Sequence, residues 1–236
     1  MSSRVQIPCM VLAAGRGERM RPLTDHLPKP LLSVKDKTLL DWHLENLAKN
    51  GAHQIVINHA WLGEKIIQHI KASSFPELHI CLSEEKSALE TAGGLRQGMS
   101  MMAIEDYFFA INGDIFCPDF PFNKIQMIVD NLRQSKQQVL AYLFLINNPD
   151  HNMDGDFCLN KDLITEKKGS VQSYTFSGAG IYHQDLLKGI KMGEVAKLAP
   201  LLKLAMSKNQ VAGELLNVGW VDVGTPERLI ELNRKI

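Results

Sequence analysis

Short apolar runs alternate with amphipathic stretches over the first half of the chain. The apolar runs lie at 9–12, 54–58, 78–83 and 107–112, and their length and β-branched or aromatic content predict strands buried on both faces. The stretches at 38–50, 62–71 and 94–102 instead repeat apolar residues at helical spacing, as Leu40, Leu44 and Leu47 do in the first. Strands that alternate with helices predict an α/β fold with a doubly wound, mostly parallel, Rossmann-like sheet.

The pattern changes from residue 120 onward. Helical spacing recurs at 123–133, 198–207 and 226–234, and extended patterns lie at 139–146, 157–163, 171–182 and 211–218. A polar stretch at 147–156 and a turn at Lys167-Lys168-Gly169 separate some of these strands. We therefore expect one compact domain with two lobes, residues 1–119 and a smaller mixed-strand lobe of residues 120–236 that covers the open end of the sheet.

Polar or small residues follow the predicted parallel strands. Gly15, Asn58, Ser83 and Asp114 each stand at or just after the end of one strand. Ligands of doubly wound sheets bind at the carboxyl ends of the strands. We therefore expect these four residues to lie along one rim and to form part of a single site.

The loop after the first strand has the composition of a phosphate-binding loop. Gly15 and Gly17 allow the backbone to approach an anion closely, while Arg16, Arg19, Arg21 and Lys29 bring positive charge to the same place. The dinucleotide fingerprint G-x-G-x-x-G is excluded because its third glycine falls on Met20, and no Gly-Lys-Ser/Thr completes a P-loop. An ordinary strand and loop with surface arginines is the simpler alternative to a nucleoside triphosphate site.

The full stretch favours the triphosphate site. Residues 12–24 read L-A-A-G-x-G-x-R-M-x-P-L-T and residues 28–31 read P-K-P-L, which closely resembles the signature of the sugar-1-phosphate nucleotidyltransferases. This resemblance implies the nucleotide-diphospho-sugar transferase fold and a transfer that joins a nucleoside triphosphate to a sugar 1-phosphate and releases pyrophosphate. The first lobe would then bind the nucleotide and the second the sugar phosphate.

Asp114 and Asp222 each close an apolar stretch, as Asn112-Gly113-Asp114 and Val221-Asp222-Val223-Gly224. Two carboxylates from separate strand ends suit Mg²⁺, which completes its coordination with phosphate oxygens and water. Capping of the following turn is the alternative for either residue alone. The family carries a metal-binding aspartate in each of these motifs, so the resemblance implies that Asp114 and Asp222 hold Mg²⁺.

The resemblance also implies roles for other residues. Arg19 and Lys29 would be catalytic by neutralising phosphate charge, and Asn112, Asp156, Ser177, Gly178 and Asp222 would bind the sugar phosphate. Glu90 replaces the first glycine of the family's L-G-T-A-G stretch. Whether Glu166, Lys167 or Lys168 contacts the sugar phosphate stays open, because the proline of the family's Glu-Lys-Pro is missing here. The nucleotide-binding residues would be Leu12, Ala13, Ala14, Gly15, Gly17, Glu18, Arg19, Lys29, Glu85, Thr91 and Gly93.

Composition restricts the partners. Lys+Arg and Asp+Glu both number 26, so no overall basic field favours nucleic acid or an anionic membrane, and no apolar run is long enough to span a bilayer. The 4 cysteines lie far apart without a C-x-x-C pair, which predicts reduced thiols and no structural zinc. We expect a cytoplasmic enzyme without a signal peptide, acting on small molecules, with no protein partner implied.

The substrates are narrowed by further segments. Residues 57–63, 89–91, 148–151, 155–157 and 197–202 resemble the N-acetylmuramate-1-phosphate uridylyltransferase subgroup, which acts in cell-wall sugar recycling. That resemblance implies UTP and N-acetylmuramate 1-phosphate. A mannose-1-phosphate guanylyltransferase, a glucose-1-phosphate thymidylyl- or uridylyltransferase, and a catalytically silent nucleotide-sugar sensor remain alternatives. No hexapeptide repeat is present, so we expect no second, acyltransferase activity.

Overall fold

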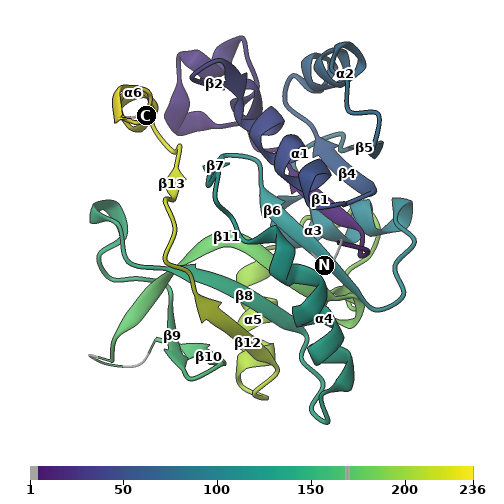
Figure 1. The fold of residues 1–236 in the computed structure, drawn as a ribbon, viewed down its shortest axis with the longest axis vertical. Helices are drawn as coiled ribbons and strands as arrows, with labels where there is room; N and C mark the ends of the chain where they lie inside the picture. The colour runs from purple at the N-terminus through teal and green to yellow at the C-terminus, as the bar shows by residue number, and fades with distance from the viewer. Residues whose placement is uncertain (1–4, 168, 170, 236) are drawn as a thin grey trace.

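The computed structural model describes residues 5–167, 169 and 171–235. Within them, nine strands form one sheet in the order β5-β4-β1-β6-β11-β8-β12-β10-β9 (Figure 1). The strands of this sheet are β1 (Cys9–Leu12), β4 (Gln54–His59), β5 (His79–Glu84), β6 (Tyr107–Asn112), β8 (Ala141–Ile146), β9 (Phe157–Asn160), β10 (Leu163–Glu166), β11 (Ser173–His183) and β12 (Val211–Leu215). Two small ladders pair β2 (Ser33–Val34) with β3 (Lys37–Thr38) and β7 (Ile115–Phe116) with β13 (Val221–Asp222).

The first half of the sheet is parallel, as the sequence predicted. β5, β4, β1 and β6 all run in the same direction, with Leu12 level with Asn58 on one side and with Asn112 on the other. β11 then pairs antiparallel with both β6 and β8, and only β8 and β12 are parallel in the second half. The α/β class and the mixed second half are confirmed. The predicted division at residue 120 stays a prediction, and the sheet runs across it.

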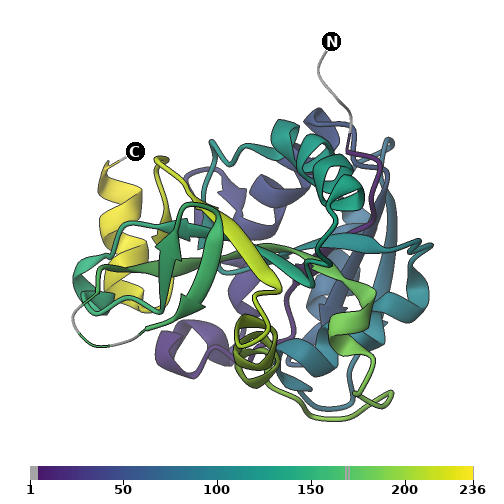
Figure 2. The same ribbon diagram turned by 90° about the horizontal axis from the view of Figure 1, so that it is seen from below.

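Helices cover both faces of the sheet (Figure 2). They are α1 (Leu39–Lys49), α2 (Gly63–Ala72), α3 (Glu90–Gly98), α4 (Ile125–Gln134), α5 (Leu198–Met206) and α6 (Pro226–Lys235). Short 3₁₀ turns lie at Glu18–Met20, Leu23–Asp25, Lys29–Leu31, Met99–Met101, Phe122–Lys124, Asp150–Asn152 and Gln184–Leu187. Within the described residues, no helix has both the length and the apolar character needed to cross a bilayer.

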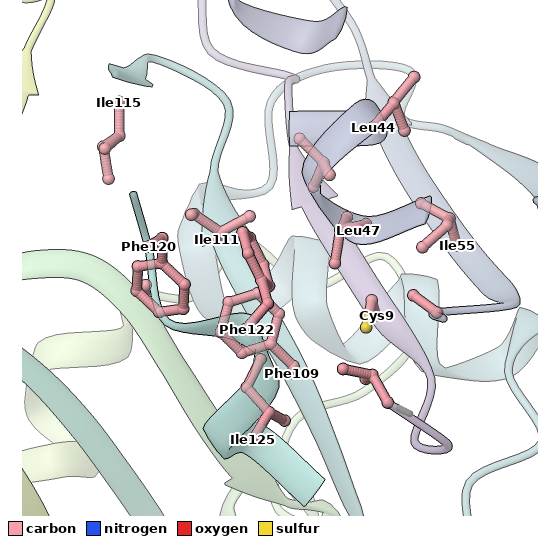
Figure 3. Close-up of a cluster of buried hydrophobic side chains, with 14 of the residues drawn as sticks. Cys9, Leu44, Leu47, Ile55, Phe109, Ile111, Ile115, Phe120, Phe122 and Ile125 are labelled. Carbon is pink, nitrogen blue, oxygen red and sulfur yellow. The ribbon is translucent and has the colours of Figure 1, made fainter. Parts of the chain in front are cut away.

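The strand alternation divides the core between the two faces. Cys9 and Val11 point to the face covered by α1 and α4, while Met10 points to the face covered by α3 and α5. On the first face, Phe109 and Ile111 of β6 meet Phe120 and Phe122, with ring centroids 5.6 Å apart for both Phe109–Phe120 and Phe109–Phe122 (Figure 3). Apolar burial on both faces explains why these strands read as continuous hydrophobic runs rather than alternating ones.

Two predicted elements are wrong in their bounds. Helix α3 begins at Glu90, not at 94, because its glycines allow close packing on the sheet instead of breaking the helix: a Cβ on Gly98 would lie 2.7 Å from Met10 Sδ. The predicted strand 157–163 is instead the hairpin of β9 and β10, which turns at Lys161 with φ 57°. Part of the turn predicted at 167–169 lies outside the described residues.

A third cluster ties the C-terminus to the first loop. Leu229 and Leu232 of α6 pack with Met20, Leu32 and Leu39, and α6 lies next to β2 (Figure 1). Arg19 and Lys29 belong to the same loop, and Asp222 immediately precedes α6. The C-terminal segment is therefore placed against the N-terminal loop, more than 190 residues away in sequence.

Candidate active site

A cavity of about 450 Å³ opens at the carboxyl ends of β1, β4 and β6. This is where a doubly wound sheet binds its ligand. The predicted residues that line the cavity are Leu12, Ala13, Ala14, Gly15, Gly17, Glu18, Arg19, Lys29, Glu85, Thr91, Asn112 and Asp114. Of the expected rim, Gly15, Asn58 and Asp114 line it, whereas Ser83 is fully buried outside the lining.

The loop after β1 is shaped by its own polar contacts. Gly17 adopts the left-handed conformation with φ +68°, and a Cβ there would stand 3.1 Å from Thr24 Cγ2. The Thr24 hydroxyl donates to the Gly17 carbonyl at 2.8 Å. Gly15 has nothing within 4 Å of the position of an added Cβ, so its backbone is open to the cavity. The loop therefore presents bare main chain to a ligand.

Two of the four predicted cations are engaged in holding this loop. The Arg16 guanidinium stacks 3.7 Å from the centre of the Trp61 ring and donates to Asp25 Oδ1 at 3.0 Å. Arg21 also donates to Asp25, at 2.8 Å, and these two arginines hold the pKa of Asp25 below its ordinary value. Trp61 Nε1 donates to the Thr24 carbonyl at 2.9 Å. Arg16 and Arg21 thus brace the loop, while Arg19 faces the cavity.

Lys29 and Asp114 form an ion pair inside the cavity. Lys29 Nζ lies 2.5 Å from Asp114 Oδ2, and the side chains are 9% and 32% exposed. The short turn Lys29–Leu31 buries the lysine stem, so its ammonium reaches only inward. The cation is therefore placed beside the first of the two predicted metal-binding carboxylates.

Asn58 and Glu85 connect the first loop to the segment before α3. Asn58 Oδ1 accepts from Ala13 N at 2.7 Å, and Asn58 Nδ2 donates to Glu85 Oε1 at 2.7 Å. Glu85 Oε2 accepts from Leu89 N at 2.8 Å. Burial raises the pKa of Glu85, and the two hydrogen bonds oppose that rise. Both side chains line the cavity and fix the positions of the two loops on either side of it.

Asp222 lies next to Asp114 in the backbone. Asp222 pairs with Ile115 across the β7–β13 ladder, and Val223 N donates to the Asp114 carbonyl at 3.0 Å. Asp222 does not line the cavity itself, but its carboxylate lies against Gly224, which does: a Cβ on Gly224 would be 3.0 Å from Asp222 Oδ2. The two aspartates predicted from distant motifs are thus neighbours at the cavity edge.

This donor set fits a hard divalent cation. Both carboxylates are partly exposed and supply oxygen ligands, which Mg²⁺ combines with phosphate oxygens and water. Lys29 neutralises Asp114 and Arg228 neutralises Asp222. Within the described residues no group of three His, Cys, Asp or Glu side chains could hold a metal unaided. A metal here would need ligands from the substrate.

The segment 90–93 forms the start of α3, with Thr91 in the cavity lining and Gly93 outside it. Glu90, where the family has glycine, keeps a left-handed backbone with φ 60° and lines the cavity together with Thr91. Gly93 does not line it, because the backbone of 194–196 covers it: Gly93 N donates to the Ala196 carbonyl at 3.1 Å. The predicted nucleotide contact of Gly93 stays untested.

Of the predicted sugar-binding residues only Asn112 lines the cavity, and Gly178 and Asp222 lie against the lining residues Asn112 and Gly224. Gly178, with φ +80°, sits in an irregularity of the β11–β8 pairing, and a Cβ there would be 2.7 Å from Asn112 Nδ2. The neighbouring Ser177 is buried, and its carbonyl accepts from Trp220 Nε1 at 2.9 Å. Gly178 is thus a glycine at an irregular point of the sheet, and the sugar roles of Ser177 and Gly178 stay predictions.

The carboxylate of Asp156 already has two protein donors. Asp156 Oδ2 accepts from Phe176 N at 2.8 Å and Oδ1 accepts from Asn152 Nδ2 at 3.2 Å. Farther out, Glu166 pairs with Lys203 at 3.2 Å and Lys167 pairs with Asp154 at 3.7 Å, while Lys168 lies outside the described residues. The hydrogen bonds of Asp156 join the 150–152 turn to β11, and its predicted sugar contact is untested.

Five lining residues were not expected at the site: Met20, Pro30, Ala88, Glu90 and Gly224. Arg16 and Asn58 also line the cavity; the sequence placed them in the phosphate loop and on the rim without assigning them a ligand contact. The signal for Asn58 was an amide at the end of a buried parallel strand. Met20 and Ala88 carried none, because apolar lining residues look like core residues in a sequence.

Comparison with known proteins agrees with this geometry. The family model described as "Nucleotidyl transferase" matches residues 9–236. N-acetylmuramate alpha-1-phosphate uridylyltransferase of Neisseria meningitidis serogroup B is 44% identical over 224 residues, 94% of this chain and 95% of that protein. The chain belongs to the sugar-1-phosphate nucleotidyltransferases. Its reaction class is therefore transfer of a nucleotidyl group to a sugar 1-phosphate, with small molecules as substrates.

More distant relatives carry the names of two different nucleotidyltransferases. The uridylyltransferase of the same name from Caulobacter vibrioides is 28% identical, covering 92% of both chains. Mannose-1-phosphate guanylyltransferase catalytic subunit beta of Drosophila pseudoobscura pseudoobscura is 25% identical over 92% of this chain but only 59% of its own length. Divalent-metal use is typical of nucleotidyltransferases of this family.

Solved structures support the fold. A putative glucose-1-phosphate thymidylyltransferase from Bacillus anthracis, solved in complex with a sucrose, superposes with a TM-score of 0.78 at 18% identity over 97% of this nucleotidyltransferase and 94% of that chain. HddC from Yersinia pseudotuberculosis, complexed with GMP-PN, superposes with a TM-score of 0.75 at 18% identity over 98% of this chain and 99% of that one. Both show the same arrangement of strands and helices.

Proposed function

We propose that the enzyme transfers the uridylyl group of UTP to N-acetylmuramate α-1-phosphate, forming UDP-N-acetylmuramate and pyrophosphate in cell-wall sugar recycling. The observation that carries this proposal is the 44% identity to the Neisseria meningitidis uridylyltransferase, which extends over nearly the whole of both chains. A relative of the same name at 28% identity supports it. The guanylyltransferase relatives from the two Drosophila species are about as distant as that second one, at 25% and 24% identity.

The reaction needs positioning and charge neutralisation more than proton transfer. A phosphate oxygen of the sugar 1-phosphate attacks the α-phosphorus of UTP in line, a new P–O bond forms, and the bond to the β-phosphate breaks as pyrophosphate leaves. The attacking oxygen is already anionic at neutral pH, so the enzyme needs no general base. The cavity residues must hold two anions together and stabilise the charge that develops between them.

The chain's own groups divide this work. The backbone around Gly15 and Gly17 and the side chain of Arg19 bind the triphosphate, and Lys29 neutralises charge at the α-phosphate as the bond changes proceed. The buried ammonium of Lys29 suits this part, since it lies beside Asp114 at the cavity floor and has few other positions to adopt. Glu85, Asn58 and Thr91 border the space for the base and ribose.

Mg²⁺ is the metal we propose, and Asp114 and Asp222 would hold it. When bound, it would supply Lewis-acid stabilisation of negative charge on the α-phosphate. Lys29 lies beside Asp114, so its ammonium is close to the place where this carboxylate would hold the metal and the phosphates would bind.

We further propose that residues 1–119 bind the nucleotide and residues 120–236 the sugar phosphate, with Asn112, Asp156, Ser177 and Gly178 on the sugar side. We also place the enzyme in the cytoplasm. All four cysteines are unpaired, and Cys9, Cys117 and Cys158 are buried, which suits a reducing compartment.

The test is a matrix of pyrophosphate-release assays. UTP, GTP and dTTP are each combined with the 1-phosphates of N-acetylmuramate, mannose and glucose, in the presence of Mg²⁺ and after chelation by EDTA. We expect turnover with UTP and N-acetylmuramate 1-phosphate that stops on chelation and returns with added Mg²⁺. Turnover with GTP and mannose 1-phosphate alone would contradict the proposed substrates. No turnover with any pair, despite tight nucleotide binding, would indicate a nucleotide-sugar sensor.

A further inference from the structure

A second cationic centre lies beside Asp222, outside the phosphate loop. Arg228, in the first turn of α6, donates from Nη1 to Asp222 Oδ2 at 2.7 Å and to the Asp222 carbonyl at 3.1 Å. The same Nη1 lies 3.1 Å from Nε2 of His151, which comes from the loop after β8. The guanidinium therefore joins the C-terminal segment to a loop on the sugar side of the sheet.

The position of this centre is at the edge of the cavity. A Cβ on Gly224, which lines the cavity, would stand 2.9 Å from Arg228 Nη1. The Arg228 and His151 side chains are 20% and 34% exposed, so both remain open to a ligand.

Arg228 keeps donors free for a ligand. Within the described residues, the guanidinium makes its hydrogen bonds to Asp222 and His151 through Nη1, which leaves Nε and Nη2 out of these bonds. A guanidinium has five N–H donors in a planar fork that matches a carboxylate. The bonds to Asp222 and His151 fix the plane of this fork before any substrate arrives.

The proposed sugar substrate carries an anion that its common relatives lack. N-acetylmuramate differs from N-acetylglucosamine by a lactyl ether on the ring, which ends in a carboxylate. A carboxylate taken out of water needs a charged partner. On the proposed sugar side, Lys167 pairs with Asp154 and Lys203 pairs with Glu166.

We infer that Arg228, held in place by His151, binds the carboxylate of the sugar substrate and thereby selects a sugar 1-phosphate that carries its own acid group. This inference rests on the proposed function, because it assumes N-acetylmuramate 1-phosphate as the substrate. Arg228 contacts substrate through Nε and Nη2, and His151 acts through Arg228 as a positioning residue. Asp222 balances the charge of Arg228 while the subsite is empty.

A purely structural part for Arg228 is the competing explanation. Arg228 contacts Asp222, so its removal can lower kcat with every sugar. A neutral sugar separates the two, because N-acetylglucosamine 1-phosphate shares the phosphate, the ring and the acetamido group but lacks the carboxylate. Loss of carboxylate binding changes the affinity for one sugar only, whereas misplacement of Asp222 affects both.

The experiment compares Arg228→Gln, Arg228→Lys and His151→Gln with the unchanged enzyme, and uses Arg234→Gln as the matched control. Arg234 is exposed near the end of the same helix. The measurements are KM and kcat for N-acetylmuramate 1-phosphate, the inhibition constant of N-acetylglucosamine 1-phosphate against that turnover, KM for UTP, and the melting temperature. An inhibition constant is measurable whether or not the neutral sugar reacts.

We expect Arg228→Gln to raise KM for N-acetylmuramate 1-phosphate roughly 10- to 100-fold, as loss of a charge-assisted hydrogen bond does. The inhibition constant of the neutral sugar and KM for UTP should change less than about twofold. Arg228→Lys should recover part of the loss, His151→Gln should give a smaller loss of the same kind, and Arg234→Gln should change nothing.

Equal changes for the charged and the neutral sugar would overturn the inference and leave Arg228 as a support for Asp222. A rise confined to KM for UTP would overturn it in favour of a triphosphate contact. If the unchanged enzyme does not use N-acetylmuramate 1-phosphate at all, the proposed function has failed rather than the assignment of Arg228 within it. A variant that does not fold shows this in its melting temperature, and the conservative Arg228→Lys then decides.

Discussion

Exchanging one atom type in the Asn58–Glu85 pair should change the pH dependence of stability. In Asn58→Asp, a carboxylate oxygen replaces the amide nitrogen that lies 2.7 Å from Glu85 Oε1, while the oxygen that accepts from Ala13 N is kept. The side chain has the same shape, so packing is unchanged. Asn58 and Glu85 are only 3% and 4% exposed, so water screens two facing carboxylates weakly.

The magnitude follows from two losses. The hydrogen bond from an amide to a charged carboxylate is worth about 1.5–3 kcal/mol. In addition, the folded protein avoids two adjacent negative charges by taking up a proton. Burial already raises the pKa of Glu85, and the second carboxylate raises the pKa of the pair further. The two side chains then titrate as a pair. We expect Asn58→Asp to destabilise the protein by at least about 3 kcal/mol at pH 8.

The sign of the pH effect is fixed by this proton uptake. A carboxyl whose folded pKa lies above its unfolded value stabilises the folded state at low pH, and this stability is lost as pH rises above the unfolded pKa toward the folded one. The loss of unfolding free energy in Asn58→Asp, relative to the unchanged protein, should therefore grow between pH 5 and pH 8. For one proton it grows by at most about 1.4 kcal/mol per pH unit. Urea unfolding at pH 5, 6.5 and 8, followed by circular dichroism, measures it.

The double variant Asn58→Asp/Glu85→Gln is the decisive control. It exchanges amide and carboxylate between the two positions without changing net charge. The carboxylate introduced at position 58 can still accept from Ala13 N, and the amide introduced at position 85 can donate to that carboxylate while its oxygen accepts from Leu89 N. We expect stability within about 1 kcal/mol of the unchanged protein and no added pH dependence. A single variant with a pH-independent deficit, or a double variant no more stable than the single one, would refute this reasoning.

Three further predictions concern the cavity and its loops. Lys29→Met should lower kcat by roughly 30- to 1,000-fold, about 2–4 kcal/mol, because the developing phosphate charge loses its cation. Lys29→Arg is the control that keeps the charge. An unchanged kcat in Lys29→Met would show that Lys29 takes no part in catalysis. Trp61→Ala removes the stack on Arg16 and the hydrogen bond to the Thr24 carbonyl. KM for UTP should therefore rise about 5- to 30-fold, while KM for the sugar phosphate stays constant. Equal changes in both KM values would contradict a role confined to the triphosphate loop. Glu90→Gly should raise the free energy of unfolding by up to about 1 kcal/mol, since glycine adopts φ 60° without strain, and Glu90→Ala should not; denaturant midpoints of the two variants test this.

The sequence predicted the parts of the fold that local pattern controls. Residues 9–12 and 107–112 are strands because their apolar runs are buried from both sides, and these elements were placed within a residue or two. The start of α3 was missed because glycine lowers helix propensity, whereas close packing on Met10 and Asn58 favours glycine in this helix. Tertiary contact therefore overrode local preference at that position.

The candidate site divides in the same way. The phosphate loop and the two aspartates belong to continuous motifs, and the structure brings Asp114 and Asp222 to neighbouring backbone positions. The engagement of Arg16 by Trp61 and the cover of 194–196 over Gly93 depend on segments far apart in the chain. The family motif singled out Arg19, but no local pattern records that Arg16, which also lines the cavity, is held by Trp61 and Asp25.

The antiparallel pairing of β11 with β6 joins the two halves of the molecule by main-chain hydrogen bonds along Tyr107 to Ile111. A hinge between the proposed nucleotide half and the proposed sugar half would have to break that ladder, so we expect the two halves to move together as one body. Enclosure of the substrates falls to the loops at the rim of the sheet. Small-angle scattering should accordingly give the same radius of gyration with and without both substrates, while proteolysis of the rim loops slows when they are bound.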